Sequence, residues 1–536
     1  MSMPMTAKNL FRLPILASMI LMLGSVSVSA QSTDPEIMAT DSSASELTGL
    51  TDQELLGLFN KSLADNLADK CKMAAMLSEI ARRNFAEGVE AFRAEYLVQC
   101  AIERKDWPNA YGYIKQWEAL GSENPPAMEW AFRLAYIAEE YDEALDRLEI
   151  MATADSPEQL FRLSEDLLFA LARISRDADR DDRVARQYRI LFGSPHFALL
   201  PVDIRSASAS NMLKEQLKKD DIGDVTEMLA QITSPYSYRT MLADRLYEPA
   251  WPQVEQLAGP NQSKILSRYL QETKQSLDVN PDDAGKRQEY GHALLFSGRF
   301  DEVVTLAATI DHSDAGSQGW TEDDGWLLNL EAYALDAMGK SGTADQIFEQ
   351  FGKIEYNPEE NGWLVNFVIN RATRLVNRQR WAQGLAAAQI AEEISQKSGS
   401  PYAKMLVRQA KLCALHNLGR SDEARAILSE IEEHQDDALA SAAEALLCVG
   451  EREGSAKMVI KGLQDDKERA TIVDALQKPE FELFHSASSL PSIRGELRNH
   501  PDVAKTFEAV ARDIPDEYIP LIGVKRLELA AEREAD

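Results

Sequence analysis

Apolar residues recur along most of this chain with the three- and four-residue spacing of amphipathic helices, and the helical segments come in pairs. The pairs align on a small residue one turn into the second helix, which we call the anchor. Eight clear anchors are Ala110, Ala144, Val225, Val303, Ala344, Gly384, Ala424 and Ala456, with weaker copies at Ala185 and Val254. From Val303 onward the anchors are 41, 40, 40 and 32 residues apart. Such internal periodicity is typical of a repeat array.

Positions on either side of the anchor behave as one buried face. Seven residues after the anchor every clear copy is apolar, from Trp117 in the first to Leu463 in the last. Nine residues before it, on the preceding helix, only Gln216 is polar. A helix pair with apolar surface on two sides is not stable alone, so neighbouring pairs must stack. The pattern therefore predicts an all-α fold built as a curved rod.

Three segments carry a family resemblance. Ser297–Val304, Leu418–Arg425 and Glu139–Leu148 resemble the tetratricopeptide repeat, a helix-turn-helix unit of about 34 residues. Gly298, Gly339 and Gly419 stand where a left-handed residue ends the first helix. The resemblance covers residues 92–477. It implies a right-handed α-solenoid of stacked helix-turn-helix repeats whose first helices line a concave surface for peptides or partner helices.

The pattern divides the chain into six parts. These are a signal peptide at 1–30, a flexible leader at 31–60, amino-terminal repeats at 61–258, a connecting helix or bend at 259–284, carboxy-terminal repeats at 285–477 and capping helices at 478–536. Lys8 and Arg12 precede an apolar run that ends with small residues at Val28 and Ala30, as in a cleavable secretory signal. We therefore expect an exported protein, periplasmic or secreted, with no membrane span in the mature chain.

The charge balance narrows the class of partner. Of the 536 residues, 57 are Lys or Arg and 87 are Asp or Glu, which gives a net charge of −30. Such a chain repels phosphate backbones and anionic membrane surfaces, so we expect no nucleic acid or membrane-surface partner. The same acidity favours basic partners.

The four cysteines form an even set, and an exported chain meets an oxidising compartment. Cys71 and Cys100 lie at similar distances from the break of a predicted helical hairpin, which favours a disulfide between them. Cys413 and Cys448 are a second candidate pair. For these two, unbonded buried thiols are favoured over a bridge.

A search for catalytic or ligand-binding motifs returns little. The seven histidines are scattered, and no two have the i, i+4 spacing of a helical metal site. Residues 339–341 resemble the end of a phosphate-binding loop, but Ala334 replaces the earlier glycine. Residues 311–322 match a calcium loop only in part and are better interpreted as a linker between repeats. We expect no metal, no cofactor and no catalytic residue.

The candidate partner-binding residues lie on the first helices. Fifteen and eleven residues before the anchor, most copies carry polar side chains. The candidates are Arg133, Ser210, His292, Asn329, Tyr333 and Thr373. The resemblance implies that these positions line the concave surface. The alternative, that they form the solvated stripe of any exposed helix, fits the pattern equally well.

These features favour an exported, non-enzymatic scaffold that binds an envelope or secreted protein or peptide. The alternative is an enzyme or accessory that acts on cell-wall glycan, similar to the superhelical lytic transglycosylases. Against it, the segment after Lys478 has only 58 residues and no Glu-Ser motif. Four tryptophans could face a sugar, although core packing is favoured for all of them: Trp130, Trp320, Trp326 and Trp363. Self-association by end-to-end stacking is a third possibility.

Overall fold

The computed structural model describes residues 47–63, 69–84, 89–121, 127–219, 225–310, 320–481, 488–526 and 528. The predicted signal peptide and most of the possible calcium loop lie outside these residues. The described residues form helices and connecting turns, with one isolated antiparallel bridge between Asp244 and Ala511 and no strand. The predicted all-α class is confirmed. None of the described helices is long and apolar enough to cross a membrane.

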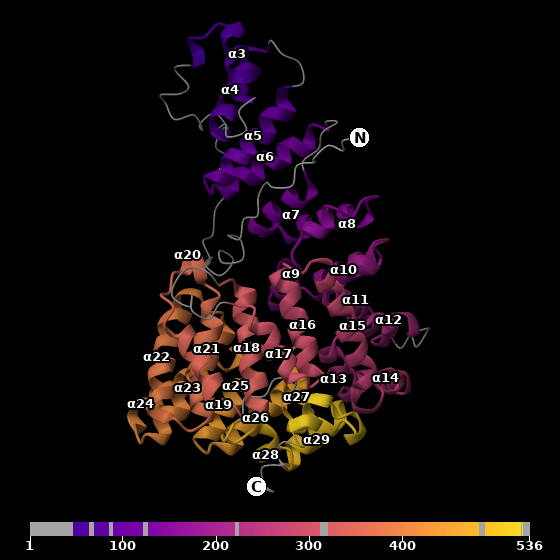
Figure 1. Ribbon diagram of the computed structural model, residues 1–536, viewed down its shortest axis with the longest axis vertical. Coiled ribbons are helices and arrows are strands. Elements are labelled where there is room, and N and C mark those ends of the chain that lie inside the picture. The colour runs from indigo at the N-terminus through magenta and orange to yellow at the C-terminus, as the bar shows by residue number, and fades with distance from the viewer. Residues whose placement is uncertain are drawn as a thin grey trace. The chain divides into compact units, whose positions relative to one another are not determined.

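The described chain divides into two compact units, which are separated within α11 between Met212 and Leu213. The amino-terminal unit contains α3 (Asp52–Leu63), α4 (Lys70–Arg83), α5 (Val89–Glu103), α6 (Trp107–Ala119), α7 (Met128–Ile137), α8 (Tyr141–Thr153), η1 (Leu160–Arg162), α9 (Glu165–Asp177), α10 (Asp181–Phe192), η2 (Phe197–Leu199) and most of α11 (Val202–Leu217). These elements are the indigo and purple part of Figure 1.

The carboxy-terminal unit contains the remaining elements (Figure 1). These are α12 (Thr226–Gln231), α13 (Pro235–Ala243), η3 (Arg245–Ala250), α14 (Trp251–Ala258), η4 (Pro260–Gln262), α15 (Ser263–Val279), α16 (Ala284–Phe296), α17 (Phe300–Ala307), α18 (Glu322–Ala337), α19 (Ser341–Phe351), α20 (Pro358–Asn361), α21 (Leu364–Asn377), α22 (Trp381–Ser398), α23 (Pro401–Asn417), α24 (Ser421–Glu433), η6 (Gln435–Asp437), α25 (Leu439–Cys448), α26 (Arg452–Gln464), α27 (Arg469–Ala475), η7 (Pro479–Phe481), α28 (Ile493–Leu497), α29 (Pro501–Val510) and η8 (Asp516–Tyr518).

Consecutive helices pack as hairpins. The first helix packs on the second in α5–α6, α7–α8, α18–α19, α21–α22, α23–α24 and α25–α26. Four of the anchors lie in second helices and are wholly buried: Ala110, Ala144, Val303 and Ala344. First helices of successive repeats also contact each other, as in α16–α18 and α21–α23. The predicted solenoid of helix-turn-helix repeats is confirmed by this pairing.

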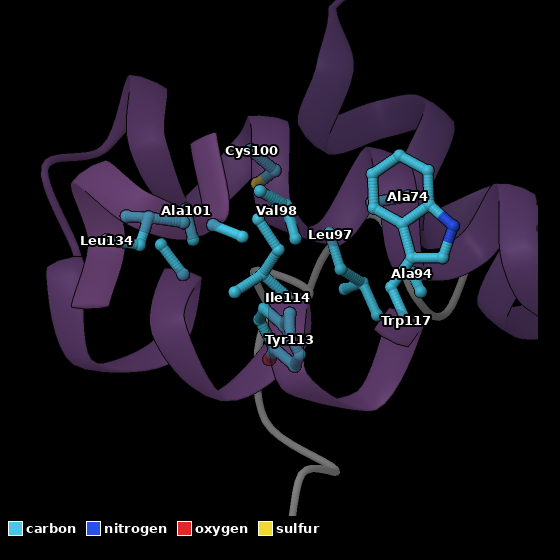
Figure 2. Close-up of a cluster of buried hydrophobic side chains, with 12 residues drawn as sticks. Ala74, Ala94, Leu97, Val98, Cys100, Ala101, Tyr113, Ile114, Trp117 and Leu134 are labelled. Carbon is cyan, nitrogen blue, oxygen red and sulfur yellow. The ribbon is translucent and has the colours of Figure 1, made fainter. Parts of the chain in front are cut away.

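In the amino-terminal unit, α4 to α7 share one apolar core (Figure 2). It includes Ala74 of α4, Leu97 and Val98 of α5, Ile114 and Trp117 of α6, and Leu134 of α7. Beside it, Leu55 of α3 is wholly buried against Met73, Met76 and Ile80 of α4. Residues 52–60, expected to belong to a flexible leader, are therefore helical and packed. The segment is mostly polar, so the sequence did not predict that it packs, but Leu55 makes the apolar contact that fixes it.

The corner between the two helices has the same backbone geometry in eight of the described hairpins. One residue at each corner has positive φ: Lys105, Glu139, Asp179, Gly298, Gly339, Gln379, Gly419 and Gly450. At Gly298, its own N–H donates to the carbonyl of Leu295 at 2.9 Å, and the N–H of Arg299 donates to that of Leu294 at 3.0 Å. This pair of bonds is the Schellman motif, which satisfies the last carbonyls of the first helix.

The corner geometry corrects the alignment of the last repeat. Gly419 lies five residues before the anchor Ala424, whose N–H donates to the carbonyl of Arg420 at 2.9 Å. Ser455 lies five residues after Gly450, and its backbone N–H donates to the carbonyl of Glu451 at 3.0 Å. Ser455 is also wholly buried, as an anchor should be. The last anchor is therefore Ser455 and not Ala456. The residue eleven before it is Glu444, where the sequence alignment placed Ala445.

The carboxy-terminal unit closes on itself. Packing contacts run from α15 through α16, α18, α21, α23 and α25 to α27, and α27 packs on α13, which contacts α15. The bridge between Asp244 and Ala511 and a hydrogen bond of 3.1 Å from Asn261 to the carbonyl of Ile519 join the start of the unit to its end. In Figure 1 the yellow helices α27 and α29 lie beside α13. This unit is thus a closed circuit of helices, where an open curved rod was expected.

Arg512 is the most heavily bonded residue of this closure. Its Nε donates to the carbonyl of Leu242 at 2.8 Å, and its backbone N–H donates to that of Ala243 at 2.9 Å. The guanidinium also pairs with Glu255 at 2.7 Å and lies 3.6 Å from the centre of the Trp251 ring. The segment after residue 478, expected to cap the last repeat, does pack on α25 and α26 through α28 and α29. It also binds the first elements of the same unit.

Candidate functional site

The candidate site is a strip of residues on the first helices of the carboxy-terminal unit. We call the positions fifteen and eleven before the anchor in α16, α18, α21, α23 and α25 the inner wall. Its row nearer the helix starts is Gln288, Asn329, Ile369, Gln409 and Ala440, and its row nearer the corners is His292, Tyr333, Thr373, Cys413 and Glu444. Successive helices of this set pack on one another, so each row runs across adjacent repeats.

The middle of the wall contains a small cavity between α18 and α21. Tyr333, Phe348, Asn370, Thr373 and Arg374 line its volume of about 40 Å³. One water needs about 10–15 Å³ of cavity volume measured in this way, so the cavity takes a few waters or a small side-chain group. Small-molecule sites in proteins have about 300–1,000 Å³. The cavity can therefore hold the tip of a side chain but not a cofactor or a sugar ring.

The amide next to this cavity is fixed by its neighbour on the adjacent helix. Asn329 is 2% exposed, and its Oδ1 accepts a hydrogen bond of 3.2 Å from Nδ2 of Asn370. Tyr333 and Thr373 are half-buried one turn further along α18 and α21. Polar groups from two successive repeats thus meet in one place.

Below the cavity lies a buried group of ion pairs. The side chains of Arg374 and Asp336 are only 3% and 5% exposed. Arg374 donates to Asp336 and, at 2.8 Å, to Asp345, while Arg378 donates to Asp336 at 2.6 Å. Burial alone would raise the pKa of the Asp336 carboxyl, but the bonds and charges of both arginines lower it. Arg380 also pairs with Asp345 at 3.0 Å, so three arginines face two aspartates in this group.

His292 contributes an uncharged imidazole to the wall. It lies on α16 with its ring centre 5.9 Å from that of Phe296. Burial lowers the pKa of His292 to about 4, because the charged form loses its hydration. At neutral pH this side chain offers hydrogen bonds without charge.

The six residues proposed from the sequence do not form one site. Asn329, Tyr333 and Thr373 come together on α18 and α21, and His292 follows on the neighbouring α16. Arg133 and Ser210 belong to the amino-terminal unit. There Arg133 donates to Glu129 at 3.1 Å and to the carbonyl of Arg162 at 2.8 Å, while Ser210 is half-buried in α11.

Sequence reasoning missed two residues here, Glu444 of the wall and Tyr402 beside it. Glu444 of α25 accepts a hydrogen bond of 3.0 Å from Nε2 of Gln409 on α23. Tyr402 lies seven residues before Gln409, on the same face of α23, and is 56% exposed. Glu444 was assigned to the wrong face because the last repeat was aligned one residue too late. The corner glycine, Gly450, is the signal that would have found it.

A disulfide crosses the same wall. Cys413 of α23 and Cys448 of α25 are bonded, with an S–S distance of 2.00 Å. The sequence favoured two unbonded thiols here, because it could not show that α23 and α25 are adjacent first helices. In the amino-terminal unit, Cys71 of α4 and Cys100 of α5 are also bonded, at 2.05 Å.

Two groups with catalytic or metal-binding chemistry lie outside the lining of the cavity. Burial raises the pKa of Glu331 to about 7, a value that suits a general acid, but its side chain is 7% exposed and does not line the cavity. Asp69, Cys71 and Glu103 are close enough to hold a metal ion, yet the sulfur of Cys71 is in the disulfide.

Three of the four tryptophans considered for sugar stacking form an aromatic cluster, and the fourth, Trp130, packs on the core of the amino-terminal unit. Trp326 and Trp363 pack on Phe367 with ring centres 5.0 and 5.5 Å away, and Trp320 packs on Phe351 at 5.5 Å. Phe351 and Phe367 in turn stack at 4.5 Å. Their ring contacts are with one another, in keeping with the core packing favoured from the sequence.

Comparisons with known proteins add little to this picture. No protein-family model matches the sequence, and no curated protein matches it. One similar solved structure is the crystal structure of the APC/C hetero-tetramer Cut9–Hcn1. It is 12% identical and covers 87% of this chain and 85% of that chain, with a TM-score of 0.28. Similarity at this level supports no functional argument, so the fold assignment rests on the helix pairing of this chain.

Proposed function

We propose that this chain is a non-catalytic scaffold that binds a segment of another protein along the inner wall of its carboxy-terminal unit. The observation that carries the proposal is the meeting of Tyr333, Asn370 and Thr373 around a cavity that admits only a side-chain tip. A row of polar groups across adjacent helices suits an extended chain, which presents amides and side chains at regular intervals.

We place the protein outside the cytoplasm, in the cell envelope or secreted. The amino-terminal sequence pattern supports this location, since residues 1–30 have the composition of a cleavable export signal. Two disulfides also support it, because such bonds persist in oxidising compartments and are rare in the cytosol. The partner would then be an envelope or secreted protein.

A pull-down from an envelope extract tests the proposal. The purified protein is compared with the double variant Tyr333→Ala, Thr373→Ala, and Thr305→Ala on the exposed face of α17 is the matched control. We expect the control to recover the same partner as the unchanged protein and the double variant to recover much less. Equal recovery by all three would remove the inner wall from the account.

The same preparation tests for the rival activity on cell-wall glycan. Incubation with purified peptidoglycan should release no soluble fragments. Release that disappears in a Glu331→Gln variant would show that the protein is an enzyme, and the non-catalytic proposal would then be wrong.

A further inference from the structure

We infer that the inner wall selects an extended peptide in which a small side chain and a basic side chain lie five or six residues apart. This inference rests on the proposed function and specifies the chemistry of the partner. Two places on the wall carry it, and the distance between them sets the spacing.

The first place is the cavity at Tyr333 and Thr373. Its volume of about 40 Å³ suits a small side chain such as that of alanine, serine or threonine. Phe348 gives it an apolar side, while the Asn370 amide and the Thr373 hydroxyl offer hydrogen bonds. The guanidinium of Arg374 is already paired with Asp336 and Asp345.

The second place is the carboxylate of Glu444 beside Tyr402. Gln409 donates to this carboxylate at 3.0 Å and so fixes its position on the wall. Tyr402, on the same face of the adjacent helix, exposes 56% of its surface. A carboxylate next to an exposed aromatic ring suits a lysine or arginine side chain, through a charge-assisted hydrogen bond and a cation–π contact. The net charge of −30 favours the same partners over longer distances.

The spacing follows from the helices that separate the two places. The cavity adjoins α21, and Glu444 lies on α25, two packed helices further along the circuit. Packed helices are about 8–10 Å apart, so two steps cover roughly 16–20 Å. An extended chain advances about 3.3–3.6 Å per residue, which gives five or six residues.

The carboxy-terminal segment of the same chain contacts the corner end of α21. The backbone N–H of Ser489 donates to the carbonyl of Asn377 at 2.8 Å, at the corner end of α21. The protein's own carboxy-terminal segment therefore occupies the corner end there. Thr373, at the cavity, lies one turn before Asn377 on α21, and Tyr402, beside Glu444, is 56% exposed.

A random dodecapeptide library displayed on phage tests the inference with the full chain as bait. We expect enriched peptides to carry Ala, Ser or Thr five or six positions from Lys or Arg. Glu444→Gln should lose the basic preference and keep the small one, and should bind a selected lysine peptide about tenfold more weakly. Thr373→Leu, which fills the cavity, should lose the small preference. Glu432→Gln, on the exposed face of α24, is the control for charge and should change neither.

The outcomes separate the inference from the function on which it rests. The inference is wrong if the enriched peptides lack this spacing, or if Glu444→Gln keeps the preference for basic residues. Either result would leave the proposed peptide binding intact. Failure to enrich any sequence would contradict both. Thermal unfolding midpoints that agree among the four proteins show that each variant is folded.

Discussion

At the scale of single residues, the hairpin corners show how one backbone position is filled by different side chains. Gly298, Gly339, Gly419 and Gly450 adopt positive φ without cost, whereas the same position holds Lys105, Glu139, Asp179 and Gln379 in other repeats. The left-handed conformation brings the Cβ of these residues too close to the backbone. Each non-glycine corner therefore reduces stability for a reason that is local and can be reversed.

We predict that Gln379→Gly stabilises the protein by roughly 0.5–1 kcal/mol and that Gly419→Ala destabilises it by about 1 kcal/mol. A Cβ at residue 419 would meet no atom within 4 Å, so its effect would come from the backbone alone. Urea unfolding of each variant measures the change. Gly342→Ala, inside α19 and equally open, is the control and should cause no loss.

A second prediction at this scale concerns the buried carboxyl of Glu331. Its pKa rises from 4.5 to about 7 on folding, so the folded state holds its proton more tightly than the unfolded state. Stability from this group is complete below pH 4.5 and is lost as the pH rises to 7, by about 3 kcal/mol in total. The unfolding midpoint of the unchanged protein should therefore fall between pH 5 and 8, and that of Glu331→Gln should fall less over the same range. An unchanged slope would contradict this assignment.

At the scale of elements, side chains at the same level join successive helices. Asp336 lies near the end of α18 and Asp345 lies in α19. Arg374 lies in α21 and Arg378 directly follows it, so these ion pairs connect one complete hairpin to the first helix of the next. Removing one member leaves an uncompensated charge in a site of low polarity. The pairs at this junction should therefore matter far more than pairs on the surface.

We predict that Arg374→Ala destabilises the protein by about 3–5 kcal/mol. Arg425→Ala is the comparison, because Arg425 pairs with Asp422 on the surface, where both side chains are mostly exposed. That variant should leave the unfolding midpoint unchanged. If both variants unfold at the same denaturant concentration, the junction at Arg374 does not hold the two hairpins together.

At the scale of the molecule, the carboxy-terminal unit gains a property that no single repeat has. Residues 239–262 at its start are bonded to residues 474–519 at its end through Arg239, Arg245, Asn261, Gln262 and Arg512. An open solenoid frays at its ends, because each repeat contacts only its neighbours. A closed circuit couples its first elements to its last ones.

We predict that Arg512→Ala increases amide hydrogen exchange in α13 and α14 as strongly as in α29. The cause is loss of the side-chain hydrogen bond to Leu242, the contact with Trp251 and the ion pair with Glu255. Exchange in the distant α19 should not change. Faster exchange confined to the last helices would show that the unit behaves as an open array.

The sequence predicts what is local and periodic. The anchors, the paired helices, the corner glycines and the pair Tyr333 and Thr373 all follow from spacing, because helices impose a period on buried positions. The closure of the carboxy-terminal unit does not follow, since it depends on small rotations that accumulate over many repeats. Glu444 was missed for a different reason: a register error of one residue turns a helix by about 100° and exchanges the faces.

The central claim is that the inner wall of the carboxy-terminal unit, and not the outer helices, contacts another protein. The direct test is site-specific photo-cross-linking in the producing cell, with benzoylphenylalanine at Tyr402 on the wall or at Ile390 on the outer helix α22, which is also exposed. The account predicts a covalent adduct with another protein at residue 402 and none at 390. No adduct at 402, or the same adducts at both positions, would contradict it.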